Sequence, residues 1–209
     1  PRSSSAASDV YKRQVSNNHW RFDKTRLLER LALDKLLVIN DFTAQALAQH
    51  NAADGDRRQI LDGIEDASAP LLVIGPGTGL GVSALIPVVQ GPLPVEGEGG
   101  NIRFAPQTEP ERDLCAYMEQ QTDHVVVEHF VSGPGLENIH RFLANSAGIE
   151  TSLSAEMIAT SALREEGICR DAVNLMIGIL GAVMRDHVLT LGCWRGAVIT
   201  GGIMPRLQS

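Results

Sequence analysis

The sequence predicts a mixed α/β fold, and three observations support this prediction. Short apolar runs of the kind that form buried strands occur at residues 36–39, 71–74 and 197–200. Amphipathic helical patterns occupy much of the sequence between these runs. The resulting order of strand, helix, hairpin, helices and strand is typical of α/β proteins.

Length, net charge and composition limit the classes of protein to which this chain can belong. The 209 residues are enough for one large domain, or for one domain and part of another. A net charge of −7 argues against nonspecific binding to nucleic acid or to a membrane surface and favours a cytoplasmic protein. The longest apolar run, Leu175 to Met184, is too short to span a bilayer. The three cysteines lie far apart without a histidine cluster, so we expect reduced thiols and no metal site.

Both ends of the chain are unusual. The chain begins with Pro1 and a serine-rich stretch, and it stops at Ser209 shortly after a Gly-Gly turn. We interpret the chain as an internal fragment of a longer protein. Residues 1–14 resemble translated adaptor sequence and are expected to be a non-native leader, with a genuine disordered tail as the alternative.

The first elements predicted in chain order are a helix, a strand and a second helix. Asp23 is expected to cap a helix in which leucines recur at residues 27, 28 and 31. The apolar run at residues 36–39 predicts a buried parallel strand, and residues 43–50 predict a helix. Asn40 and Asp41 would then lie at the carboxyl end of a strand, where open α/β sheets place ligands.

Residues 71–82 form the central stretch, in which a strand, a glycine turn and a second strand follow one another. Glycines stand at residues 75, 77, 79 and 81, and backbone amides in such a turn can form a nest for an anion such as phosphate. A Walker loop would need Lys and then Ser or Thr after the last glycine, and a dinucleotide fingerprint would need a following helix. The stretch has neither, so it predicts a phosphate-sized hairpin, with a glycine hairpin that binds no ligand as the alternative.

The rest of the chain predicts a loop, several helices and a last strand at residues 197–200. A short helix is expected around Ile60, and a loop at residues 94–101 places Glu98 between glycines. Further helices are expected at residues 109–121, 125–131, 136–145, 154–166 and 172–191. Within the last helix, Gly178 and Gly181 suggest the close approach of another helix or strand.

Four stretches together resemble the bacterial ATP-dependent glucokinase family, which has the actin-like, hexokinase-type ATPase fold. They are Asn40-Asp41-Phe42-Thr43-Ala44, the hairpin at residues 75–82, the Glu98-Gly99-Gly100 loop and the Gly201-Gly202 turn. Glu128 and Ser132-Gly133-Pro134-Gly135 strengthen the resemblance, which extends from about Val15 to Arg206. It implies two α/β lobes, with residues 15–51 as the remnant of a small lobe and residues 52–209 as a large lobe truncated at its C-terminus.

The resemblance also implies roles for individual residues and names the ligands. Asp41 would be the catalytic base of a transfer from ATP, with Mg²⁺, to a hexose such as glucose. The residues implied to contact the sugar are Asn40, Asp41, Glu98, Asn101 and Glu128. Those implied to hold ATP are Gly77, Thr78 and Gly79 at its terminal phosphates and Gly201 and Gly202 near its adenosine. The family resemblance further suggests a homodimer.

Elementary chemistry supports these roles independently of the resemblance. A sugar hydroxyl is a poor nucleophile, and a carboxylate within hydrogen-bond reach can take its proton during attack on a phosphoryl group. The remaining catalysis of phosphoryl transfer comes from positioning and from charge stabilisation. The alternatives left open by the residues are an Asx turn or helix cap for Asp41, an exposed loop charge for Glu98 and a solvated helix position for Glu128.

Two departures from the family pattern bear on function. Asn101 stands where the family usually has a histidine, which suggests an altered sugar affinity or epimer preference. The family's Asp-x-Gly-Gly-Thr phosphate loop is missing from the sequence, so we expect these 209 residues alone to be inactive. The sequence thus predicts a glucokinase that acts at the start of glycolysis; a kinase for another hexose and a sugar-binding regulator that transfers no phosphate are the alternatives. The six histidines are given no role.

Overall fold

The structure is a computed structural model that describes residues 12–14, 21–164 and 166–204. The chain divides into two compact units, residues 1–39 and residues 40–209. This boundary lies earlier than the expected one at residue 51, because the helix that begins at Asp41 packs with the second unit. Most of the expected leader, residues 1–14, lies outside the described residues, and the assignment of the two lobes stays a prediction.

The first unit contains one strand pair and one helix. Strands β1 (Lys12–Gln14) and β2 (Arg21–Asp23) are antiparallel, and helix α2 (Lys24–Arg30) follows directly. The carboxylate of Asp23 accepts hydrogen bonds from the amides of Thr25, at 2.9 Å, and Arg26, at 3.3 Å. The expected N-cap is therefore confirmed.

The expected strand at residues 36–39 is wrong. These residues form no strand, and Leu37 is 68% exposed. An apolar run becomes a buried strand only when neighbouring strands satisfy its backbone groups, and within the described residues this run pairs with none. Asn40 and Asp41 therefore do not lie at the end of a strand. They lie instead at the start of the helix Asp41–Ala48.

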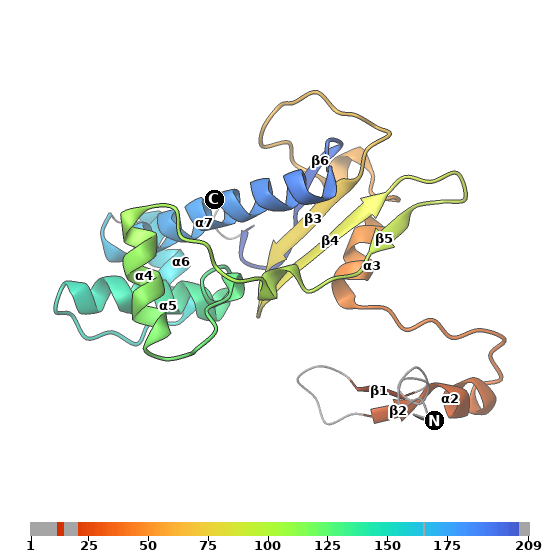
Figure 1. The fold of residues 1–209 in the computed structure, drawn as a ribbon, viewed down its shortest axis with the longest axis horizontal. Coiled ribbons are helices and arrows are strands. Elements are labelled where there is room, and N and C mark those ends of the chain that lie inside the picture. The colour runs from red at the N-terminus through yellow and green to blue at the C-terminus, as the bar shows by residue number, and fades with distance from the viewer. Residues whose placement is uncertain (1–11, 15–20, 165, 205–209) are drawn as a thin grey trace, which may run out of the picture. The chain divides into compact units, whose positions relative to one another are not determined.

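The second unit is built on a four-stranded sheet in the order β5 (Leu93–Val95), β4 (Leu80–Ile86), β3 (Leu71–Pro76) and β6 (Gly196–Ile199). The expected hairpin at residues 71–82 is confirmed, since β3 and β4 are antiparallel with Pro76 opposite Leu80. Strand β6 extends the sheet in parallel to β3, and β5 pairs antiparallel with β4. Figure 1 shows this sheet beside the helices of the same unit.

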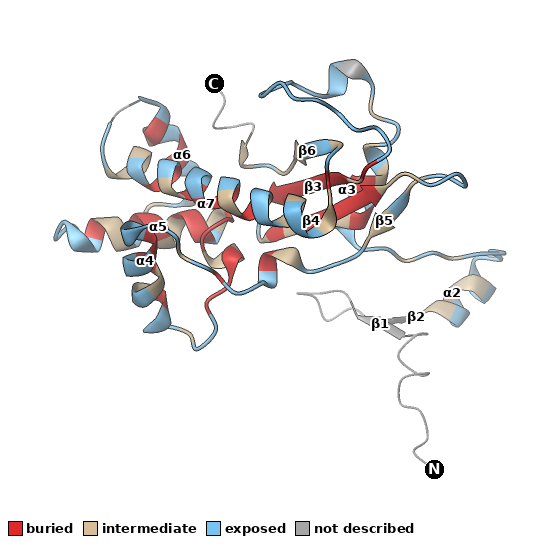
Figure 2. Ribbon diagram, turned by 45° about the horizontal axis from the view of Figure 1, so that its top comes forward, coloured by how far each residue is buried: buried red, intermediate tan, exposed pale blue. Residues whose placement is uncertain are grey.

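Both faces of the hairpin are covered, so β3 is buried throughout and β4 along most of its length (Figure 2). Side chains alternate between the two faces of a strand. Leu72, Ile74 and Val82 belong to the main core, which also contains the buried side of the long helix α7 (Ile168–Leu191). The opposite face carries Gly75 and Gly81, and helix α3 (Asp41–Ala48) packs there.

The remaining helices form a layer beside the sheet. They are α4 (Glu109–Glu119), α5 (Gly133–Ser146) and α6 (Ala155–Arg164), and both α5 and α6 pack on α7. Three 3₁₀ turns complete the unit, namely η1 (Asp54–Asp56), η2 (Gly99–Asn101) and η3 (Val127–His129). All the expected helices after residue 100 are found except one, although α5 begins at Gly133 rather than after it.

The expected helix at residues 125–131 is wrong, because only the turn η3 forms there. The residues before the turn pair with an extended segment instead: the Phe104 amide donates to the Val125 carbonyl, and the Val127 amide donates to the Ile102 carbonyl. Valine loses side-chain freedom in a helix and favours such extended pairing. The short helix expected around Ile60 is also missing, and that side chain is 60% exposed.

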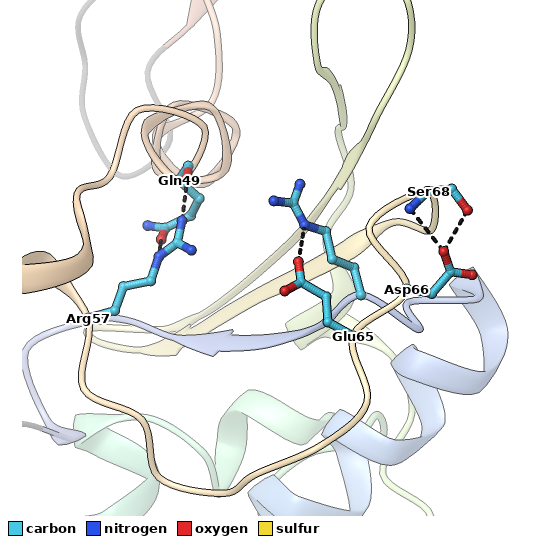
Figure 3. Close-up of polar contacts among 6 residues, drawn as sticks. Gln49, Arg57, Glu65, Asp66 and Ser68 are labelled. Carbon is cyan, nitrogen blue, oxygen red and sulfur yellow. Dashed lines mark hydrogen bonds and ion pairs between the residues drawn. The ribbon is translucent and has the colours of Figure 1, made fainter.

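Polar contacts hold the long connection between α3 and β3 against neighbouring elements (Figure 3). Arg57 donates to both the side chain and the carbonyl of Gln49 at the end of α3. Glu65 pairs with Arg195, at 3.0 Å, just before β6. The carboxylate of Asp66 accepts from the amide and the hydroxyl of Ser68, and these hydrogen bonds lower the pKa of Asp66. The connection is thus fixed at points along its length although it contains little regular structure.

Helix α7 is, among the described residues, the one helix that is long and apolar enough to cross a bilayer by length and composition alone. In this structure its apolar side is part of the core, where Met176, Ile179 and Leu180 are buried. Core packing therefore accounts for the composition of α7. The expectation drawn from Gly178 and Gly181 is wrong, because an added Cβ at either glycine would meet no atom within 4 Å.

Replacing Gly178 by Ala is expected to stabilise the protein by roughly 0.5–1 kcal/mol, because glycine in a helix interior costs about that much relative to alanine. The matched control is Gly192→Ala, which should destabilise because Gly192 ends α7 with φ +64°. Urea unfolding of both variants measures the difference. A destabilised Gly178→Ala protein would contradict the exposed position of this helix face.

Candidate active site

The hairpin turn is the structural centre of the candidate site. Within the turn, the Gly77 amide donates to the Gly79 carbonyl at 2.8 Å. Thr78 is exposed at the tip, and an added Cβ at Gly77 would meet no atom within 4 Å. The turn therefore presents Gly77 and the hydroxyl side chain of Thr78 to open space.

Glu128 lies against this turn. Its Oε2 accepts a hydrogen bond from the Leu80 amide at 3.1 Å. An added Cβ at Gly79 would lie 2.7 Å from the same oxygen, so glycine at that position leaves room for the carboxylate. Glu128 is half-buried, lies on η3 rather than on a helix, and is thus not a solvated helix position.

The first turn of helix α5 is also bonded to the hairpin. The Gly133 amide donates to the Gly77 carbonyl at 2.8 Å. Ser132 caps the helix by accepting from the Gly135 amide at 2.9 Å, and its hydroxyl donates to the Glu128 carbonyl at 2.7 Å. Ser132 therefore fixes both the N-terminus of α5 and the backbone of Glu128.

Asn40 and Asp41 lie at the start of α3. The cap of this helix is Asn40, whose side-chain oxygen accepts from the amides of Phe42, at 2.7 Å, and Thr43, at 3.4 Å. Asp41 is the first helical residue, and its exposed carboxylate accepts from the Phe42 amide at 2.9 Å. The alternative of a helix cap thus applies to Asn40 rather than to Asp41.

Phe42 joins α3 to the hairpin, and the sequence analysis missed it. Gly75 and Gly81 lie opposite each other in the β3–β4 ladder, and an added Cβ at Gly81 would overlap the Phe42 ring. At Gly75 such a Cβ would lie 2.9 Å from Cζ of the same ring. A signal was present in the sequence, since two glycines placed symmetrically about a turn leave a flat patch for an aromatic ring.

The loop that carries Glu98 and Asn101 lies on the other side of Leu80. Both side chains are exposed, and the intervening turn η2 packs on β4. A Cβ at Gly100 would overlap the Leu80 carbonyl, so only glycine allows the backbones to approach this closely. The Leu80 amide is bonded to Glu128 and its carbonyl faces Gly100, so Leu80 lies between the two expected sugar-binding segments.

The turn after β6 meets the hairpin from the neighbouring strand. The Thr200 amide donates to the Ile74 carbonyl at 2.8 Å. Gly201 has φ +94°, and an added Cβ would lie 2.5 Å from the Pro76 carbonyl oxygen. Gly202 is exposed and has no atom within 4 Å of an added Cβ. Of the two expected adenosine-side glycines, Gly201 therefore contacts the hairpin directly, and Gly202 is the residue that follows it.

Of the expected site residues, Glu128 and Gly201 contact the hairpin directly, while the loop of Glu98 and Asn101 approaches it through Gly100 and Asp41 lies next to Phe42, whose ring packs on it. Two further residues contact this region without having been expected from the sequence, namely Phe42 and His187 of α7, whose ring lies against Gly99. A histidine without ligand spacing to other polar residues gives no sequence signal for such a contact. The described residues contain no group of three or more His, Cys, Asp or Glu side chains that could hold a metal ion.

Comparison with solved structures identifies the class of the fold. A crystal structure of a glucokinase from an Antarctic psychrotroph is similar with a TM-score of 0.83 and 30% identity, over 95% of this chain and 62% of that one. A glucokinase from Balamuthia mandrillaris in complex with glucose has a TM-score of 0.74 at 21% identity, which shows the fold alone. The chain therefore has the mixed α/β fold of sugar kinases.

Comparison of sequences identifies the family. The glucokinase family model matches residues 6–209, and the chain belongs to this family. The glucokinase of Aromatoleum aromaticum is 41% identical over 196 residues, which are 93% of this chain and 59% of the relative. The chain thus spans about three fifths of the length of the relatives that it matches.

Proposed function

We propose that the full-length protein, meaning this chain with any further sequence its reading frame encodes, is an ATP-dependent glucokinase of the cytoplasm. It converts glucose and ATP to glucose 6-phosphate and ADP at the start of glycolysis. The observation that carries this proposal is the packing of α3, η2 and η3 on one glycine hairpin, with the Glu128 carboxylate against its turn. Membership of the glucokinase family supports it.

The proposed reaction uses Asp41 as the general base. The oxygen of the glucose 6-hydroxyl forms a bond to the γ-phosphorus of ATP while the bond from that phosphorus to the β–γ bridging oxygen breaks. The hydroxyl proton passes to the Asp41 carboxylate, and ADP leaves. Asp41 suits this role because it is exposed and accepts one hydrogen bond, from Phe42, so its second oxygen can receive a proton.

The other expected residues hold the substrates in this proposal. Glu128 has Oε2 on the Leu80 amide, which leaves Oε1 for a sugar hydroxyl. Asn40, Glu98 and Asn101 offer further exposed acceptors and donors around the same hairpin. Gly77, Thr78 and Gly79 take the terminal phosphates of ATP, and Gly201 with Gly202 lies near the adenosine. Mg²⁺ bound to the nucleotide would neutralise charge on the phosphates that these residues hold.

The test is ADP release by the full-length protein with Mg-ATP and each of glucose, mannose, glucosamine and fructose. Release that requires sugar and is fastest with glucose is the expected result. Release fastest with another sugar would replace glucokinase by a kinase for that hexose, which the exposed Asn101 favours as the second candidate. No release, from a protein that glucose protects against heat, would favour a sugar-binding regulator. Size-exclusion chromatography tests the proposed homodimer.

A further inference from the structure

His187 contacts the loop that carries two of the proposed sugar-binding residues. An added Cβ at Gly99 would lie 2.9 Å from Cε1 of His187 and 2.7 Å from Cβ of Val82. The turn η2 is therefore held between strand β4 on one side and the last turns of helix α7 on the other. Glu98 precedes this contact by one residue, and Asn101 follows it by two.

The His187 ring is partly buried and incompletely hydrogen-bonded. Its Nε2 is buried and has no hydrogen-bond partner. The ring borders a pocket of about 260 Å³ that is also lined by Val82, Leu191 and residues 97–99. A buried polar atom without a partner is uncommon in folded proteins and calls for a specific explanation.

We infer that His187 is a positioning residue, whose neutral imidazole holds the Glu98–Asn101 segment in its sugar-binding position and makes sugar affinity depend on pH. This inference rests on the proposed function. A neutral ring packs against Gly99 at no cost in charge burial. A charged ring has to leave the pocket or draw water into it, and either movement displaces Gly99 and the two residues beside it.

The direction of the pH effect follows from the surroundings of the ring. Burial lowers the pKa of His187 below its ordinary value of about 6.5, while a hydrogen bond to the backbone of Gly99 and the charge of Asp186 act in the opposite direction. Asp186 on α7 and Glu98 on the loop are the charged groups around the ring, since the pocket residues of β4 carry none. As the pH falls below about 6.5, the unfolded chain takes up the proton first, so the folded form loses stability.

The test measures KM for glucose and kcat of the full-length protein between pH 5.5 and pH 8. The wild-type KM should rise several-fold toward acid pH with little change in kcat. His187→Leu should give a KM that no longer depends on pH, and His187→Lys should give a raised KM at every pH. The variants Glu98→Gln and Asp186→Asn measure how much of the pH dependence of KM comes from the two carboxylates near His187. His140→Gln is the matched control, because burial also lowers the pKa of His140, which faces Cys169 instead.

A second measurement does not depend on catalysis. Hydrogen exchange at the amides of residues 99–101 should accelerate in the wild-type protein below pH 6.5, beyond the intrinsic effect of pH, and should not do so in His187→Leu. The same profile in both proteins would overturn the inference. Absence of sugar-dependent ADP release would instead contradict the proposed function and would leave the exchange result to decide the role of His187.

Discussion

Asp41→Asn is expected to lower kcat of the full-length protein about 10²–10⁴-fold, the range typical for removal of a general base. An amide cannot take the proton of the sugar hydroxyl, whereas its size and its acceptor oxygen remain. Glucose binding should therefore persist. The expected result is a large loss in kcat with a small change in the ability of glucose to raise the melting temperature.

The structure explains why this substitution separates chemistry from folding. Helix α3 is capped by Asn40, so the cap is untouched by a change at the next residue. The amide oxygen at position 41 can still accept the hydrogen bond from the Phe42 amide. The expected cost in stability is the lost interaction of a negative charge with the helix N-terminus, about 0.3–1 kcal/mol.

The measurement is steady-state ADP release at saturating glucose, with melting temperatures with and without the sugar. Asp113→Asn is the matched control, because Asp113 is exposed on α4 and the change in charge is the same. A kcat for Asp41→Asn within a few-fold of the control would remove Asp41 from the mechanism. A loss of glucose protection together with kcat would assign Asp41 to binding instead.

The parts of the fold predicted correctly are those fixed by neighbouring residues in the sequence. The hairpin at residues 71–82 follows from apolar runs on either side of a glycine turn, and Asp23 caps a helix with its own next residues. Strand β6 was predicted because its apolar run ends at a turn of two glycines. The contacts that fix the hairpin and the cap are local, so a sequence pattern reveals them; β6 was predicted from its composition, although its partner β3 is distant in the sequence.

The errors arise where a distant partner decides the structure. The run at residues 36–39 has the composition of a strand, but a strand needs neighbours, and none pairs with it in the described chain. The valines at residues 125–127 were expected in a helix and instead pair with residues 102–104. Composition alone does not tell whether such a partner is present.

The candidate site shows the same division. The sequence indicated residues of the candidate site, but it did not show the contacts between them. Glu128 and Leu80, for example, are 48 residues apart in the chain. The glycines at residues 75 and 81 were predicted to belong to a turn whose backbone amides could bind an anion. In the structure they are positions where a side chain would collide with Phe42.

Gly81→Ala is expected to destabilise the protein by about 1–3 kcal/mol, the usual cost of forcing an extra group into a packed site. The new methyl group would overlap the Phe42 ring, which has to move away from the hairpin. Because Asp41 precedes Phe42, we also expect kcat to fall. Gly77→Ala is the matched control for stability, since its methyl group would meet no atom within 4 Å and its φ is not positive.

The cause can be isolated by removing the ring as well. In Gly81→Ala combined with Phe42→Ala the collision no longer exists, so the double variant should be more stable than the sum of the two single losses predicts. A coupling of about 0.5–3 kcal/mol between contacting residues is the expected size. Urea unfolding of the four proteins in this cycle gives the value. Additive losses, or a Gly81→Ala protein as stable as Gly77→Ala, would mean that Phe42 does not rest on the glycine pair, and the position of Asp41 relative to the phosphate turn would then need another anchor.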